Sequence, residues 1–264
     1  MTPSTTHLVL IPSYNAGPRL LSTVEDALRH WSPVWVVIDG STDGSVGDVR
    51  QLAGRDPRVR VTVCGKNAGK GAAIEIALSA AQEEGFTHVL TMDSDGQHPA
   101  DHIADFMRAS ASHPDALVLG RPVFGPDVPS IRFYGHKASV ALAWIEILGA
   151  GIDDPLFGFR VYPIAPLRRA FEATRHARRF DFDHEIAVRM FWAGVPTINK
   201  PAPCRYSTKA EGGVTHFHYV RDNLTLVGLH LRLLAELIPW RLVQVCRART
   251  RRPVESVQAT VSSR

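Results

Sequence analysis

Short apolar runs alternate with helix-like segments through the first 120 residues, and this alternation constrains the fold more than any other feature. The apolar runs end in polar or turn-forming residues, as buried strands do, and they span residues 7–11, 34–38, 59–63 and 87–92. The segments between them carry apolar residues at helical spacing and span residues 17–30, 45–54 and 71–84. This order predicts an α/β fold with a doubly wound, mostly parallel sheet flanked by helices.

Composition excludes several classes of protein. The chain has 264 residues, enough for one large α/β domain with an appendage, and its apolar content of 45% is typical of a globular core. Three scattered cysteines (Cys64, Cys204 and Cys246) form no CxxC pair, so neither a zinc site nor a disulfide framework is indicated and a reducing cytoplasm fits. We find no signal-peptide pattern and no uncharged apolar run long enough for a transmembrane helix.

Two carboxylates follow the strand expected at 87–92. Asp93 and Asp95 lie in the sequence Met-Asp-Ser-Asp-Gly-Gln-His, and ligands of open α/β sheets bind beyond the carboxyl ends of the strands. Such a pair can bind Mg²⁺ or Mn²⁺ and leave positions open for phosphate oxygens, which indicates a nucleotide-diphosphate site. An acidic surface turn is the alternative interpretation. An EF-hand is excluded, because Ala104 stands where its glutamate is needed.

Other polar residues are expected at the same edge of the sheet. The loop 67–71 (Asn-Ala-Gly-Lys-Gly) is not a P-loop, yet its backbone N–H groups and Lys70 could approach an anionic or ribosyl group. Asp39 could contact a nucleobase or ribose, or it could cap the next helix. Arg121 follows another apolar run and could meet a phosphate. An ordinary loop with a solvated lysine remains the simpler alternative for residues 67–71.

The segment Phe180-Asp181-Phe182-Asp183-His184-Glu185 places three acids among aromatic residues. Such a run could hold a general base or close an acceptor pocket. It could equally be an exposed helix N-terminus, where acids suit the helix dipole. His216 and His218 fit ordinary surface or core histidines better than ligands.

Together these motifs resemble the family 2 glycosyltransferases of GT-A fold. Four segments carry the resemblance in the family's order, at residues 11–15, 38–44, 67–71 and 93–98. Within the family, the chain is most similar to dolichol-phosphate mannosyltransferase and the polyprenyl-phosphate glycosyltransferases. A looser likeness, carried by residues 211–217 and 221–223, is to soluble members of aryl-polyene and xanthomonadin-type clusters. The resemblance covers roughly residues 7–235.

The resemblance implies roles for individual residues. Asp93, Asp95 and Gln97 would bind Mg²⁺ or Mn²⁺. Ile38 departs from the family, because many members have a second aspartate at this position, and base recognition stays open. The residues implied to contact the nucleotide sugar are Pro12, Tyr14, Asn15, Asp39, Lys70, Asp93, Ser94 and Asp95. Those expected to bind the acceptor or its phosphate are Arg121, Arg132, Arg160, Arg205 and Lys209.

The implied reaction moves a sugar from a nucleotide-diphosphate sugar to a lipid-linked acceptor, most simply a polyprenyl phosphate, with inversion, as in the family. The cation would hold the leaving diphosphate, with added positive charge from Arg205 and Lys209. A lipid phosphate is already anionic and needs no base, only positioning by Arg121 and Arg132. A hydroxyl acceptor, of lipid or aryl-polyene type, needs a base: Asp183 first, Glu185 second.

We expect a GT-A catalytic domain at 1–215, with a nucleotide-sugar half at about 1–120 and an acceptor half at 121–215. An amphipathic helical segment at 216–248 and a basic, disordered tail at 249–264 follow. The apolar stretch from 224 is interrupted by charges and Pro239, so it could lie on an anionic membrane surface rather than span it. The enzyme would then be cytoplasmic and peripheral on the inner face of the cell membrane. Residues 139–147 could be a second interfacial helix, and core packing is the alternative for both segments.

Two other classes of protein fit less well. A nucleotidyltransferase needs a Gly-rich basic loop after the first strand, where this chain has Pro12-Ser13-Tyr14-Asn15. A non-catalytic sugar-nucleotide-binding scaffold would not need both Asp93 and Asp95. Nucleic-acid binding is disfavoured, because the basic residues are concentrated in a tail and not on an aromatic-rich face. No pattern specifies the sugar or the oligomeric state.

Overall fold

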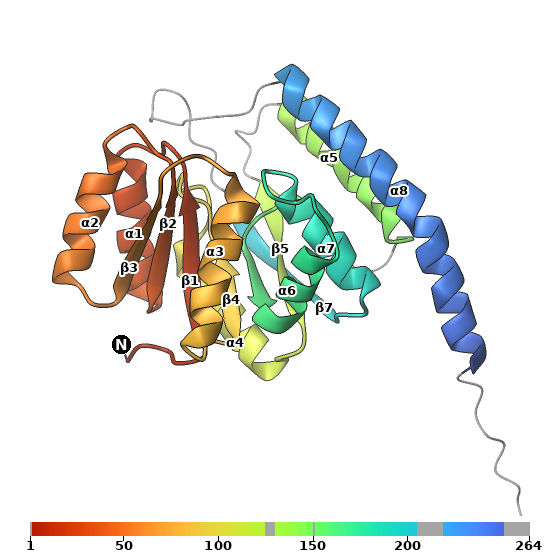
Figure 1. Ribbon diagram of the computed structural model, residues 1–264, viewed down its shortest axis with the longest axis horizontal. Helices are drawn as coiled ribbons and strands as arrows, with labels where there is room; N and C mark the ends of the chain where they lie inside the picture. The colour runs from red at the N-terminus through yellow and green to blue at the C-terminus, as the bar shows by residue number, and fades with distance from the viewer. Residues whose placement is uncertain (1, 125–129, 150, 205–218, 251–264) are drawn as a thin grey trace, which may run out of the picture.

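The computed structural model describes residues 2–124, 130–149, 151–204 and 219–250, with backbone alone for 130–136, 138, 219–223 and 241–250. Helices cover both faces of one seven-stranded sheet (Figure 1). The strands are β1 (His7–Ser13), β2 (Val34–Asp39), β3 (Val59–Cys64), β4 (His88–Thr91), β5 (Leu117–Phe124), β6 (Arg160–Pro163) and β7 (Thr197–Cys204). The helices are α1 (Arg19–His30), α2 (Ser45–Arg55), α3 (Lys70–Glu83), α4 (Ile103–Ser112), α5 (Ser130–Glu146), α6 (Ile164–Glu172), α7 (Phe182–Trp192) and α8 (Tyr219–Thr250), with a short 3₁₀ turn η1 (Ala100–His102).

The strand order is β3-β2-β1-β4-β6-β5-β7, and β6 alone among these strands is antiparallel to its neighbours. Because β6 is antiparallel to both β4 and β5, those two strands point the same way as β1, β2, β3 and β7. Six carboxyl ends therefore meet at one edge of the sheet, which is where this class of fold binds ligands. The mostly parallel sheet and the seven elements expected before residue 92 are confirmed.

Side chains of the central strands alternate between two apolar layers. Leu8 and Leu10 of β1 pack into the layer beneath α3, α6 and α7, whereas Val9 and Ile11 pack beneath α1 and α4. All four are fully buried. A strand covered on both faces needs apolar residues at every position, which explains why the sequence shows continuous runs instead of alternation.

Helices α5 and α8 lie side by side at one end of the molecule (Figure 1). Leu229 and Leu233 of α8 are buried in the same core cluster as α3 and α7. The expected C-terminal helix is present and continues through Pro239. Within the described ranges, no helix is long and apolar enough to cross a membrane. The domain boundary expected near residue 215 and the tail beyond 250 lie outside the described residues, so both stay predictions.

Two stacked histidines at the opposite edge of the sheet make stability sensitive to acid. His7 and His88 stack with ring centroids 4.3 Å apart, and burial followed by the charge of His88 lowers the pKa of His7 from 6.5 to about 4. The unfolded chain therefore binds more protons between these values, so the free energy of unfolding must fall as pH falls through this window. We expect a loss of about 1–2 kcal/mol between about pH 7.5 and 5 from His7, after a discount for its partial solvation.

Urea denaturation at the two pH values measures this loss in wild type and in His7→Gln, where the loss should shrink. His113→Gln is the matched control, because His113 is exposed. An unchanged pH dependence in His7→Gln would show that the acid sensitivity has another source.

Candidate active site

The loops after β1 and β2 are joined by side-chain hydrogen bonds into one platform. Asn15 Oδ1 accepts the N–H of Thr42 at 2.7 Å, and Ser41 Oγ accepts the N–H of Asn15 at 3.0 Å. Asp43 Oδ2 accepts the N–H of Gly17 at 2.7 Å. The segment 12–15, implied to contact a nucleotide, thus lies beside the turn 39–43, with Pro12 buried and Tyr14 exposed.

Asp39 at the end of β2 organises the loop that begins α3. Its two oxygens accept the N–H groups of Ala68 and Gly69 at 2.8 and 2.6 Å, and its side chain is buried. Gly69 has φ of +106°, and a Cβ there would lie 2.5 Å from the carbonyl oxygen of Arg178, so glycine is required. Asp39 therefore holds this loop and does not cap α2, while its contact with a nucleotide stays a prediction.

Lys70, the first residue of α3, lies between two carboxylates. Its Nζ is 2.6 Å from Asp93 Oδ1, beyond β4, and 2.6 Å from Asp183 Oδ2, in the first turn of α7. Burial disfavours the charged amine, but the two carboxylates outweigh it and raise the pKa of Lys70. Gly158 leaves room for this amine, since a Cβ there would lie 2.5 Å from Nζ.

The turn that contains Asp93 and Asp95 is anchored by a histidine. The N–H of Asp93 donates to His98 Nδ1 at 2.9 Å, and the His98 ring lies edge-on to Phe157 with centroids 4.7 Å apart. Burial lowers the pKa of His98, which fits a neutral ring that accepts this bond. No role was expected for His98 from the sequence, although the residue stands next to Gln97 in the same run.

Beside His98, the turn backbone is held by α1. Arg19 donates to the carbonyl oxygen of Asp95 at 3.1 Å, and Thr23 donates to that of Ser94 at 3.3 Å. Sequence reasoning also missed these two residues, because both contacts are to backbone oxygens more than 70 positions away.

The acidic pair fits a divalent cation. Burial alone would raise the pKa of Asp93, but Lys70 above all brings it to about 2, so this carboxylate is ionised. Burial, and then the charge of Asp93, raises the pKa of Asp95. Two carboxylates that repel in this way would gain from a shared hard cation. Asp93 is 36% exposed and so accessible to one. Gln97, whose N–H donates to Asp95 Oδ1 at 3.0 Å, lies next to the pair.

Glu185 cannot serve as the alternative base, and this expectation is corrected. Its carboxylate is fully buried and accepts hydrogen bonds from Thr174 at 2.7 Å, Arg189 at 2.9 Å and Arg232 at 2.5 Å. Asp183, by contrast, faces Lys70. On a helix, side chains at i and i+2 point to different faces, so only one of the two acids can reach the site.

The expectation that Arg160 binds the acceptor phosphate is also corrected. Its side chain is fully buried, and its Nε donates to the carbonyl oxygen of Phe157 at 2.8 Å. One Nη donates to the carbonyl oxygen of Asp183 and, at 3.3 Å, to the hydroxyl of Tyr162. Arg160 thus fixes the backbone that carries Asp183, and its side chain is not exposed to a phosphate, although its second Nη has no hydrogen-bond partner within the described residues. Sequence reasoning could not distinguish a buried arginine from an exposed one within this apolar segment.

A pocket of about 510 Å³ opens between the end of β5 and α5. Arg121, which is exposed and lies 3.7 Å from Asp153, stands at this pocket with Lys137. The apolar part of its wall is formed by Pro122, Phe124, Val140, Ala141 and Trp144. Arg132 belongs to α5, but its side chain is outside the described residues, as are Arg205 and Lys209.

The pocket and the acidic pair lie at the same sheet edge. Cys204 ends β7 and pairs with Phe124 of the pocket wall. Burial raises the pKa of the Cys204 thiol to about 12, with further contributions from Asp95, Asp93 and Asp154. Asp154 lines the pocket, so the charges of the acidic pair and of the pocket wall both act on the Cys204 thiol.

The sequence model for glycosyl transferase family 2 matches residues 8–174. The chain belongs to this family. A polyprenol monophosphomannose synthase from Mycolicibacterium smegmatis is 28% identical over 206 residues, which cover 75% of this chain and 77% of that protein. An undecaprenyl-phosphate mannosyltransferase from Micrococcus luteus is 26% identical over 200 residues, which cover 74% and 81% of the two chains.

A solved structure supports the fold independently of close sequence similarity. Glucosyl-3-phosphoglycerate synthase from Mycobacterium tuberculosis, in complex with uridine diphosphate, superposes with a TM-score of 0.60 at 17% identity. The match covers 90% of this glycosyltransferase and 80% of that protein. The expected GT-A fold is therefore confirmed. The roles of individual site residues stay predictions.

Gly158 offers a test of the Lys70 bridge. In Gly158→Ala the new Cβ would enter the space of the Lys70 amine and lie 3.2 Å from Asp183 Oδ1, so the ion pairs must shift. We expect sugar transfer by this glycosyltransferase to fall at least about tenfold while the melting temperature stays near that of wild type. The matched control is Gly54→Ala in α2, where a Cβ meets nothing within 4 Å. Equal activity of both variants would show that the bridge is not needed.

Proposed function

We propose that this chain is a metal-dependent, inverting glycosyltransferase that moves a sugar from a nucleotide-diphosphate sugar to a polyprenyl phosphate. The observation that carries the proposal is the pocket at the edge of the sheet, where Arg121 and Lys137, with Asp153 and Asp154 beside them, adjoin an apolar wall. This is the chemistry that a phosphate attached to a hydrocarbon chain requires. The two relatives described above are named for polyprenol and undecaprenyl-phosphate substrates, which agrees with it.

On the donor side, Asp93, Asp95 and Gln97 would hold Mg²⁺ or Mn²⁺. The bound cation would supply Lewis acidity to the leaving diphosphate. A structure of the related glucosyl-3-phosphoglycerate synthase contains Mn²⁺ together with uridine diphosphate. In this chain, the platform of Asn15 and Asp39 would orient the nucleotide, and Lys70 would contribute fixed positive charge beside it. Arg205 and Lys209 keep their expected role at the diphosphate, and inversion is assigned from the family likeness.

On the acceptor side, a phosphate oxygen would be the nucleophile. It is anionic at neutral pH, so no proton has to be removed before it attacks the sugar carbon. Arg121 and Lys137 would place it, while Phe124, Val140 and Trp144 would contact the first part of the lipid chain. This arrangement gives Asp183 the task of holding Lys70 and not that of a base.

One observation favours a second acceptor class, a hydroxyl of a lipid or aryl-polyene-type compound. Asp183 Oδ1 is buried and has no hydrogen-bond partner within the part of the chain that the structure describes. A carboxylate oxygen of this kind can accept a proton from a hydroxyl nucleophile. Asp183 would then be the general base.

Peripheral binding to the inner face of the cell membrane would bring the enzyme to such an acceptor. Trp144 is 50% exposed and Ile145 and Leu148 are also exposed, at the end of α5. The exposed apolar residues of α8 recur at helical spacing, at Leu224, Val227, Leu231 and Ile238. Because α5 and α8 lie side by side, these residues can enter the boundary between lipid headgroups and acyl chains together (Figure 1).

Turnover measurements test the proposed reaction. Purified protein would be offered UDP-, GDP- and dTDP-sugars with Mg²⁺ or Mn²⁺, with and without a polyprenyl phosphate, and released nucleoside diphosphate measured. We expect release that requires both metal and the lipid phosphate, and a fall of about 10³-fold in Asp95→Asn, because the shared cation loses a ligand. Asp101→Asn, three residues beyond His98 and exposed, is the matched control and should retain activity.

The same measurements separate the two acceptor classes. Release that needs a hydroxyl compound instead of the lipid phosphate, together with a fall of about 10²–10⁴-fold in Asp183→Asn, would favour the hydroxyl acceptor. Tight nucleotide binding without release for any donor would contradict the enzyme proposal and favour a scaffold.

Vesicle binding tests the membrane surface. The double variant Trp144→Ser, Leu231→Ser removes two large exposed side chains, each worth roughly 1.5–3 kcal/mol when fully buried. We expect co-sedimentation with vesicles of anionic phospholipid to weaken more than about tenfold. Ile76→Ser is the control, because Ile76 is exposed on α3 and belongs to neither α5 nor α8. Equal vesicle binding of the double variant and Ile76→Ser would show that α5 and α8 do not contact lipid.

A further inference from the structure

A buried cluster outside the site joins three helices. Glu146, at the end of α5, accepts hydrogen bonds from His184 Nε2 on α7 at 2.6 Å and from His230 Nδ1 on α8 at 2.7 Å. The two imidazoles meet edge to face, with centroids 4.8 Å apart. All three side chains are buried, and the bonds from the two histidines outweigh burial and lower the pKa of Glu146.

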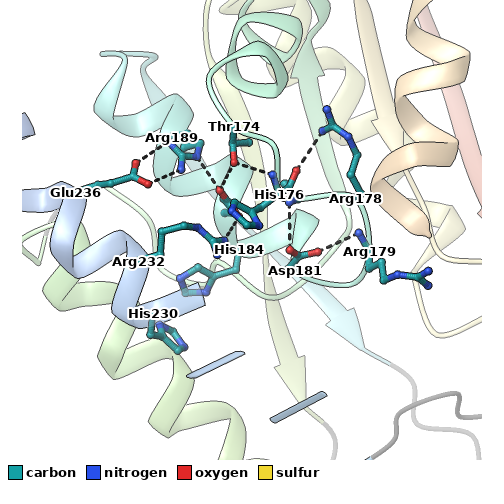
Figure 2. Close-up of polar contacts among 12 residues, drawn as sticks. Thr174, His176, Arg178, Arg179, Asp181, His184, Arg189, His230, Arg232 and Glu236 are labelled. Atoms are coloured by element: carbon teal, nitrogen blue, oxygen red, sulfur yellow. Dashed lines mark hydrogen bonds and ion pairs between the residues drawn. The ribbon is translucent and has the colours of Figure 1, made fainter. Parts of the chain in front are cut away.

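An ion-pair network follows this cluster along α8. Glu185 binds Arg189 of its own helix and Arg232 of α8, and Arg189 also reaches Glu236 of α8 at 2.9 Å. Figure 2 shows Arg189, Arg232 and Glu236 gathered between the two helices, with His184 and His230 alongside. Arg232 of α8 is therefore ion-paired with Glu185 of α7, and His230 of α8 packs on His184 of α7 and shares Glu146 with it.

These contacts start one residue after Asp183. Consecutive residues of a helix project about 100° apart, so the first turn of α7 points Asp183 at Lys70, His184 at α5 and α8, and Glu185 at Arg232. Arg160 donates a hydrogen bond to the backbone carbonyl oxygen of Asp183. A rotation of this turn that moved His184 or Glu185 would move the Asp183 carboxylate as well.

We propose that Glu146, His184 and His230 form a positioning device that locks the first turn of α7 to the α5–α8 pair and thereby sets Asp183 against Lys70. When the exposed face of the α5–α8 pair binds the membrane, fixing α8 there would order the donor site. This consequence rests on the proposed function, whereas the link between His230 and Asp183 does not.

Hydrogen bonding accounts for the cluster better than a metal does, although the three side chains are all potential ligands. The nitrogen–oxygen separations of 2.6 and 2.7 Å are those of charge-assisted hydrogen bonds. A metal-bound histidine donates its second ring N–H to a partner, and His184 Nδ1 has none within the described residues.

The test measures how well the Lys70 amine is held by Asp183. The Lys70 amine is largely covered and held between two carboxylates, so an acylating reagent should label it more slowly than exposed Lys66, measured by peptide mass spectrometry without donor or acceptor. We expect His230→Leu to raise the Lys70:Lys66 ratio about threefold or more. His230→Asn should keep the wild-type ratio, because its amide N–H can replace Nδ1–H.

Two further variants separate positioning from packing. Leu233→Ala weakens the apolar packing of α8 but keeps every hydrogen-bonding group of the cluster, so it should lower the melting temperature and leave the labelling ratio unchanged. Asp183→Asn should raise the ratio by itself, and adding His230→Leu to it should raise the ratio little further, because His230 acts through Asp183. In turnover measurements, His230→Leu should lower kcat more than it changes KM for the donor.

Several results would overturn the proposal. Equal labelling ratios in His230→Leu and wild type, or the same rise in Leu233→Ala, would reduce the cluster to ordinary packing. One equivalent of zinc in the purified protein, lost in both His230 variants together with a raised ratio in both, would make the cluster a metal site. Because the labelling uses no substrate, an incorrect acceptor assignment cannot produce any of these results.

Discussion

The ion pairs of Lys70 are the interaction on which the candidate site depends. This amine joins Asp93, delivered by β4, to Asp183, delivered by α7, 113 positions along the chain from Lys70. Without it, two carboxylates would face one another in a poorly solvated region and repel. The surrounding sequence serves this contact: Asp39 shapes the loop that begins α3, and Gly158 leaves space for the amine.

The same amine links the two halves of the proposed reaction. A cation held by Asp93 would share that carboxylate with Lys70, and its positive charge would weaken the attraction between them. The pair between Lys70 and Asp183 would then carry more of the charge balance. Metal and donor binding would in this way act on α7, which also receives the contacts of α5 and α8. The sheet edge that carries Asp93 and the α5–α8 pair thus meet in one helical turn.

Much of the fold could be predicted from local patterns. Runs such as Val34–Ile38 are apolar at every position because the sheet is covered on both faces, and the turn residues after each run mark the ligand-binding edge. The acidic pair was found for the same reason, since Asp93 and Asp95 follow a strand directly. Strand β6, by contrast, is antiparallel, and the sequence contains no local signal for strand direction.

Residues whose role depends on distant partners could not be predicted. Spacing alone indicates that Asp183 and Glu185 face different ways, but Arg232, 47 positions beyond Glu185, decides which of them reaches the site. Arg160 was expected to bind phosphate because no local feature of the sequence shows that the fold buries it. The physical rule for such cases is that buried polar groups need partners. A core helix whose first turn holds three consecutive buried ionisable residues therefore requires three separate tertiary contacts, and here those contacts connect the candidate site to α8.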